Sequence, residues 1–238
     1  MKQLNQFIAE YIIKKKLDKP IDSEDHYKYS PKTKDDLIKV IHMLLDKGET
    51  NFNCIDTSAI TDMSLIFGEM LKIQDKDFDV SEWDVSNVTN MEGLFANCVK
   101  FNCDLSKWDV SNVENMYAMF DACRWTFEGK GLDKWDTISV EEMEAMFSYC
   151  TKFNADLSNW EVGNINDFSY MFSHCSNFEG KGLDKWNTEN ARNMSYMFNN
   201  CKKFDCDLTI WDVRLVDDFE GMFDGCNKLK FKPSWYKE

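Results

Sequence analysis

The sequence predicts an α/β repeat solenoid of about seven coils of 25–28 residues, each holding one short strand and one short helix. Phenylalanines recur at steps of 25–28 residues, and tryptophans and cysteines keep the same period. A fixed period of this length is typical of stacked units that cannot bury their apolar faces alone. The columns are Trp83, Trp108, Trp135, Trp160, Trp186 and Trp211; Cys98, Cys123, Cys150, Cys175, Cys201 and Cys226; and Phe67, Phe95, Phe120, Phe147, Phe172, Phe198 and Phe223.

Each unit combines two hydrophobic patterns. Leu105, Trp108 and Val110 partly alternate with polar residues, which indicates a short strand. The next apolar residues fall at i, i+3, i+4 and i+7, the spacing of one face of a two-turn helix. In the third unit these are Met116, Met119, Phe120 and Cys123. Helices pack about 8–10 Å apart and strands about 4.8 Å apart. A helical wall opposite a strand wall would therefore curve the stack strongly, whereas short 3₁₀ turns would keep it straighter. The sequence leaves both open.

Residues 1–50 predict a helical cap, with helices at about 3–16 and 31–47. Ser30-Pro31 offers a start for the second helix, and Thr33 with Asp36 offers another. Gly48 is placed to end it in a left-handed conformation. One apolar stripe marks the first helix: Leu4, Phe7, Ile8, Tyr11 and Ile12.

The repeats are expected to fill residues 51–228, with a C-terminal cap at 229–238. Alternate units carry Gly-Lys-Gly, at 129–131 and 180–182. Glycine permits positive φ and close approach of neighbouring backbones, so every second coil is expected to present a protruding lysine loop at one edge.

The charge pattern narrows the choice of partner. The formal net charge is −14; residues 1–50 hold 10 basic and 9 acidic residues, whereas residues 51–238 hold 18 and 33. Nucleic acids and anionic membranes require a basic surface, so neither is expected as a partner. No apolar run is long enough to span a membrane, and no secretory pattern opens the chain, which favours a cytoplasmic setting over secretion.

The recurring phrases then resemble a known family. Trp83-Asp-Val-Ser-Asn-Val-Thr-Asn-Met-x-x-Leu-Phe95, its degenerate copy from Ile55, and the helix after Ser30-Pro31 are similar to the BspA-like repeats. These are leucine-rich-repeat-type surface proteins of bacteria, also found with mycoplasma lipoproteins and in some phages. The resemblance covers about residues 29–230. It implies binding of partner proteins, display at a cell surface, and no shared catalytic residues. Because the family has phage members and no secretory pattern opens this chain, the resemblance also favours a phage-derived setting.

No constellation in the sequence predicts catalysis, a cofactor or a bound metal. His174 lies next to Cys175, but the two point in different directions from consecutive positions. No spacing typical of a zinc site or a phosphate-binding loop occurs. The recurring cysteines are interpreted as buried, reduced thiols.

The sequence therefore predicts a non-enzymatic scaffold that binds a protein partner through its edge loops. The alternative is a self-assembling structural protein, surface-exposed or virion-associated, that associates through residues 1–17. The candidate partner-binding residues are Lys130, Lys134, Lys181 and Lys185 and the aspartates after tryptophan, Asp84, Asp109, Asp136 and Asp212. The aspartates have a second interpretation, as carboxylates that cap turns.

Overall fold

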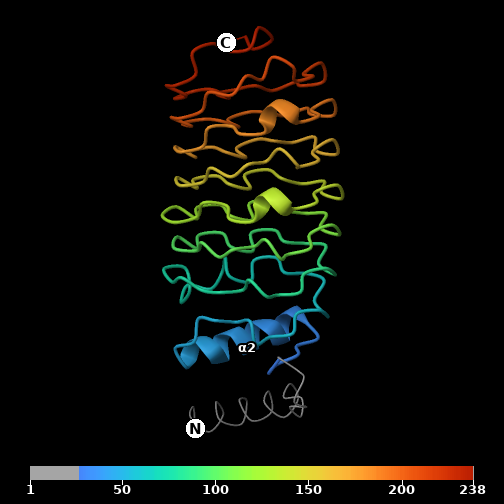
Figure 1. Ribbon diagram of the computed structural model, residues 1–238, viewed down its shortest axis with the longest axis vertical. Coiled ribbons are helices and arrows are strands. Elements are labelled where there is room, and N and C mark those ends of the chain that lie inside the picture. The colour runs from blue at the N-terminus through green and yellow to red at the C-terminus, as the bar shows by residue number, and fades with distance from the viewer. Residues whose placement is uncertain (1–26, 238) are drawn as a thin grey trace.

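The computed structural model describes residues 27–237 as a stack of coils, with one α-helix lying against the first of them (Figure 1). That helix, α2, spans Lys34–Asp46. Two 3₁₀ helices, η1 at Leu132–Lys134 and η2 at Leu183–Lys185, interrupt two of the coils. We number the coils 1 to 7 by the phenylalanine column, from Phe67 to Phe223. The predicted helix at 3–16 and the association segment 1–17 lie outside the described residues.

The prediction of one strand and one helix in each coil is wrong. Between residues 27 and 237 the structure has no strand beyond isolated parallel bridges between single residues, such as Asn90 with Asn115, and no helix besides α2, η1 and η2. The coils are built almost entirely of turns, so they form neither a parallel sheet nor a helical wall.

The segment predicted as a helix consists of two successive tight turns. In coil 3, Ala118 and Ala122 have φ of 49° and 59°, and an α-helix excludes such left-handed residues. The amide of Met119 donates to the carbonyl of Met116 at 3.2 Å, and that of Cys123 to Phe120 at 3.0 Å. A turn with positive φ at its third residue is of the type II class. Residues 115–123 and their equivalents in the other coils are called the turn wall below.

These turns leave every second backbone N–H free to donate a hydrogen bond to the next coil. Four N–H groups of coil 3 donate to carbonyls of coil 4 at 2.8–2.9 Å. A helix would use its amides internally and hold the coils at helix-packing distance, whereas the turns allow a spacing close to that of strands. The rings of successive column phenylalanines lie only 5.4–5.7 Å apart. The donors are Met116, Ala118, Phe120 and Ala122, and the acceptors are Glu142, Glu144, Met146 and Ser148.

The inner side of the turn wall faces the core. The column phenylalanines are 3% exposed or less, and the column tryptophans 4% or less. Neighbouring tryptophans stack in parallel, as in the 6.5 Å pair Trp108–Trp135. Each column indole N–H donates to a carbonyl of the preceding coil at 2.7–3.1 Å, so no polar group of these rings is buried unpaired. The tryptophan column is therefore part of the core.

The helix α2 begins at the second of its two predicted starts. The side chain of Thr33 accepts the N–H of Asp36 at 3.2 Å, and Gly48 follows the helix with a φ of 83°. The helix buries Leu37, Val40 and Ile41 in the same core as coil 1. Lys34 fixes it further, because its Nζ lies 3.3 Å from the carboxylate of Asp62.

The Gly-Lys-Gly segments behave as predicted in their backbone. Gly131 and Gly182, which precede η1 and η2, have φ of 86° and 92°. A Cβ on Gly131 would lie 2.2 Å from the backbone nitrogen of Ser106 in the preceding coil. Glycine is therefore required both for the conformation and for the approach of the two coils.

Candidate interaction surface

The four predicted lysines are exposed but do not converge. Lys130 and Lys134 belong to the coil with η1, and Lys181 and Lys185 belong to the coil with η2, two coils further along. Two of them have acidic partners within the protein. The Nζ of Lys181 lies 2.7 Å from Asp156, and that of Lys130 lies 3.6 Å from Glu128. These four lysines, called the lysine edge below, therefore form two separate positions on the surface rather than one site.

The predicted aspartates cap turns. The carboxylate of Asp109 accepts the N–H of Ser111 at 3.1 Å, and Asp84 and Asp136 make the same bond to the residue two positions on. Asp212 accepts the amide of Arg214 and binds its guanidinium at 2.6 Å. The hydrogen bonds from Ser111 hold the pKa of Asp109 below its ordinary value, and those from Arg214 do the same for Asp212. Turn capping accounts for the recurrence of this column.

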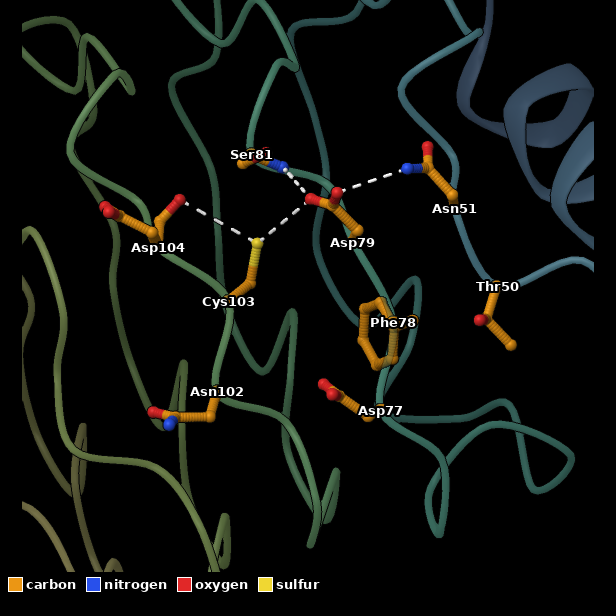
Figure 2. Close-up of a pocket in the computed structure, with 9 residues that line it drawn as sticks. All are labelled: Thr50, Asn51, Asp77, Phe78, Asp79, Ser81, Asn102, Cys103 and Asp104. Atoms are coloured by element: carbon orange, nitrogen blue, oxygen red, sulfur yellow. Dashed lines mark hydrogen bonds between the residues drawn. The ribbon is translucent and has the colours of Figure 1, made fainter.

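A hollow of about 380 Å³ lies between coil 1 and coil 3, at the edge shown in Figure 2. The polar groups around Asp79 are paired with one another. The carboxylate of Asp79 accepts the N–H of Ser81 at 2.9 Å and the amide of Asn51 at 3.2 Å, and the thiol of Cys103 donates to it at 3.4 Å. These hydrogen bonds therefore stabilise the turn around Asp79.

The thiol in this hollow is not activated. Burial, together with the nearby carboxylate of Asp79, raises the pKa of Cys103 to about 12. A reactive cysteine needs the opposite shift, since the thiolate is the nucleophile. All nine cysteines of the chain lie in the described residues and are free. In the buried column, each Sγ from Cys123 to Cys201 donates to a phenylalanine carbonyl of the preceding coil at 2.9–3.1 Å.

The outer side of the turn wall carries aromatic side chains in an unusual conformation. Tyr149, Tyr170, Tyr196 and His174 occupy the left-handed turn positions, with φ of 54–62°. Glycine or asparagine suits these positions, and a bulky residue there costs about 1–2 kcal/mol. Equivalent slots in other coils hold glycine, alanine, asparagine or leucine, so the turn itself does not require an aromatic ring. We call these four residues, together with Tyr117, the tyrosine face.

The rings of the tyrosine face are ordered in stacked pairs. Tyr170 and Tyr196 lie 5.0 Å apart, and Tyr149 and His174 lie 4.2 Å apart. The guanidinium of Arg124 sits 5.1 Å from the ring of Tyr149, an attraction between a cation and an aromatic face. Tyr117, Tyr149 and Tyr170 remain 36–41% exposed.

Polar contacts fix the orientation of two members. The hydroxyl of Tyr196 donates to Glu220, and this bond raises the pKa of Tyr196 to about 12. The Nδ1 of His174 lies 2.9 Å from the hydroxyl of Ser173. Burial and the nearby charge of Arg124 lower the pKa of His174, which favours a neutral ring at neutral pH.

The family comparison agrees with this repeat architecture. Residues 38–126 and 122–235 each match the family described as Mycoplasma protein of unknown function, DUF285. The chain belongs to this family. The two matches to DUF285 together span most of the described coils. No curated protein and no solved structure gives a match to the chain.

The described helices also bear on the membrane prediction. Among residues 27–237, this DUF285 protein has no helix that is both long and apolar enough to cross a bilayer.

Proposed function

We propose that this DUF285 protein is a non-enzymatic scaffold that binds a protein partner through the tyrosine face. The observation that carries the proposal is the set of stacked aromatic rings at left-handed positions, two of them exposed, in a backbone conformation that disfavours bulky residues. Backbone strain that persists at exposed aromatic residues is typical of binding sites. Tyrosine also supplies large contact area at low entropic cost, which suits a protein interface.

The other recurring polar side chains already have structural roles. The aspartate columns cap turns, and the buried thiols donate to carbonyls. The thiol of Cys103, in the hollow of Figure 2, is not activated, because its pKa is raised to about 12. The resemblance to BspA-like surface proteins supports a binding role and suggests display at a surface.

The test is capture of partner proteins from a host lysate on the immobilised chain, followed by mass spectrometry. The variant Tyr149→Asn/Tyr170→Asn/Tyr196→Asn removes the rings but keeps a residue that tolerates positive φ. We expect it to lose partners that the native chain retains at moderate salt.

The comparison variant is Lys130→Ala/Lys134→Ala/Lys181→Ala/Lys185→Ala. Loss of capture with these lysine changes, combined with full capture by the asparagine variant, would place the site at the lysine edge instead. Equal capture by all three proteins would leave neither surface as the site.

A further inference from the structure

The first hydrogen-bonded rung of the turn wall is missing at one junction. At the other five junctions, the residue that precedes the turns forms a parallel bridge with the equivalent residue of the next coil. The N–H of the residue after it donates to the carbonyl of that equivalent residue, as Met91 does to Asn115. Between coils 4 and 5, among the described residues, Glu142 forms no bridge with Asp167, and the N–H of Met143 has no acceptor.

The residue type at position 142 explains the gap. In the other six coils this slot holds aspartate or asparagine, whose side chain accepts the N–H two residues on at 2.7–3.0 Å. Glutamate is one methylene longer, and Glu142 makes no such bond. The equivalent residue of coil 5 is Asp167, whose carboxylate accepts the N–H of Ser169 at 2.7 Å and the side-chain amide of Asn193 in coil 6 at 3.0 Å, so a second acidic residue borders the junction.

The open junction coincides with a hollow of about 270 Å³. Tyr117 lines it from coil 3, Glu141, Glu142 and Glu144 from coil 4, and Asp167 from coil 5. No lysine or arginine lines the hollow, and none of these carboxylates forms an ion pair with a described residue. Burial, followed by the charge of Asp167, raises the pKa of Glu144, and burial together with Glu144 raises that of Tyr117.

The same side of the tyrosine face is acidic along its length. Three columns flank the first turn: the two positions before its opening methionine or phenylalanine and the one after it. Across coils 2 to 7 these columns hold nine acidic residues and one basic residue, Arg192. The acids are Glu92, Glu114, Glu141, Glu142, Glu144, Asp167, Asp217, Asp218 and Glu220.

We propose that this side of the tyrosine face binds an extended, arginine- or lysine-rich segment of the partner protein, with one cationic side chain in the hollow beside Tyr117. The inference rests on the proposed function and names the chemistry of the partner. Carboxylates bind guanidinium and ammonium groups through charge-assisted hydrogen bonds, and the tyrosine rings add attraction for the same cations. Arg124 on Tyr149 already shows a cation in this relation to the face.

The spacing of the coils suits an extended segment that runs along the stack. Column rings repeat every 5.4–5.7 Å. Alternate side chains of an extended strand point the same way at intervals of about 6.6 Å. A segment with a cation at every second position would therefore place one charge near each coil. Electrostatic complementarity of this kind sets partner choice and association rate.

The experiment measures binding of a fluorescent peptide of alternating arginine and serine, about twelve residues long so that it spans several coils. Fluorescence anisotropy compares the native chain with the variant Glu142→Gln/Glu144→Gln/Asp167→Asn. The matched control, Asp133→Asn/Asp184→Asn/Asp205→Asn, makes the same change in net charge at exposed positions elsewhere. We expect the first variant to bind at least about tenfold more weakly and the control to stay within about twofold of the native chain.

Other results would overturn the inference. These are equal binding by the two variants, no binding of the arginine peptide by the native chain, or preferential binding of a matched glutamate–serine peptide or a thymidine oligonucleotide. Thermal unfolding of each variant shows whether the fold is kept. The wider scaffold proposal is judged separately by lysate capture with the asparagine variant, which leaves the acidic residues in place. Capture that depends on the tyrosines, without arginine-peptide binding, would retain the scaffold and reject the basic partner.

Discussion

The two sides of the turn wall share one backbone, but the inner side carries the same residue type in every coil and the outer side does not. On the inner side, every coil places phenylalanine in the column from Phe67 to Phe223, and adjacent rings stack, as in Phe172–Phe198 at 5.7 Å and 1°. On the outer side, the left-handed slots hold glycine, alanine, leucine, asparagine, histidine or tyrosine. Packing fixes the residue type on the inner side. On the outer side the residue type varies although the left-handed backbone conformation is the same in each coil. The outer residues are therefore not fixed by packing, and the proposed function assigns their aromatic members to binding.

The largest expected effect lies on the inner side. Phe172→Ala removes a fully buried ring that stacks on both neighbouring coils, so we expect a loss of about 3–5 kcal/mol in the free energy of unfolding. Urea denaturation followed by tryptophan fluorescence measures it. A loss below about 1 kcal/mol would show that the inner column does not carry the fold.

A smaller loss is expected where two coils touch through glycine. Gly131→Ala combines a left-handed φ with a Cβ 2.2 Å from a backbone nitrogen, so we expect a loss of more than about 2 kcal/mol. Gly48→Ala is the matched control, because Gly48 has a similar φ of 83° and nothing within 4 Å of the added atom. The control isolates the cost of conformation, expected at about 1 kcal/mol. Equal losses would mean that the close approach at Gly131 relaxes freely.

On the outer side the same coil is expected to tolerate change. Tyr170→Asn, two residues from Phe172, loses the stack on Tyr196 but relieves a strained conformation. The two terms are similar in size, so we expect the free energy of unfolding to stay within about 1 kcal/mol of the native value. Thermal and urea unfolding both measure this. A loss as large as that of Phe172→Ala would erase the distinction between the two sides.

The smallest expected effect concerns an ion pair at the lysine edge. The hydrogen bond from Lys181, with that from Ser158, lowers the pKa of Asp156 to about 2. A lowered pKa in the folded state stabilises the protein above the ordinary aspartate range, and this stability is lost as the pH falls toward 2. Because Lys181 is exposed and Asp156 is partly exposed, solvent screens the pair and its contribution is about 0.5 kcal/mol. Asp156→Asn should therefore flatten the acid limb of the stability profile only slightly, and a large change would indicate a buried role.

The sequence predicts the columns of this protein better than its secondary structure. All positions of the phenylalanine and tryptophan columns are buried, as are the cysteines of that column except the half-buried Cys226. Thr33, Gly48 and the backbone of the Gly-Lys-Gly segments behave as expected. The two-turn helix failed because two successive type II turns also bury residues at i, i+3, i+4 and i+7, so that burial spacing alone does not separate the two. A signal was present: glycine and asparagine stand four residues apart in the same slots, at Gly93 and Asn97 and again at Gly221 and Gly225. Such residues are poor in a helix and suited to left-handed turns.

The tyrosine face was not predicted, and the candidate lysines and aspartates were chosen instead. Tyrosine at 149, 170 or 196 looks ordinary in the sequence, since its significance depends on a backbone angle that the residue itself disfavours. The open junction at Glu142 is also invisible without the hydrogen bonds of the other coils. Both features depend on the backbone conformation of the turns and on the hydrogen bonds between neighbouring coils, which cannot be read from the residue type at one position.

The alternate amides of the turn wall, at 116, 118, 120 and 122 and their equivalents, donate in one sense, from one coil to a carbonyl of the next, whereas the residue that precedes the turns, such as Asn115, donates back to the preceding coil. In an ordinary β-sheet the peptide dipoles alternate and nearly cancel. Here three or four hydrogen bonds at each junction point the same way, as the peptides of an α-helix do, and their dipoles add. The wall is therefore electrically polar along its whole length, with its amide hydrogens directed toward coil 7, so that a charged molecule on this surface experiences a field that distinguishes one direction of travel from the other.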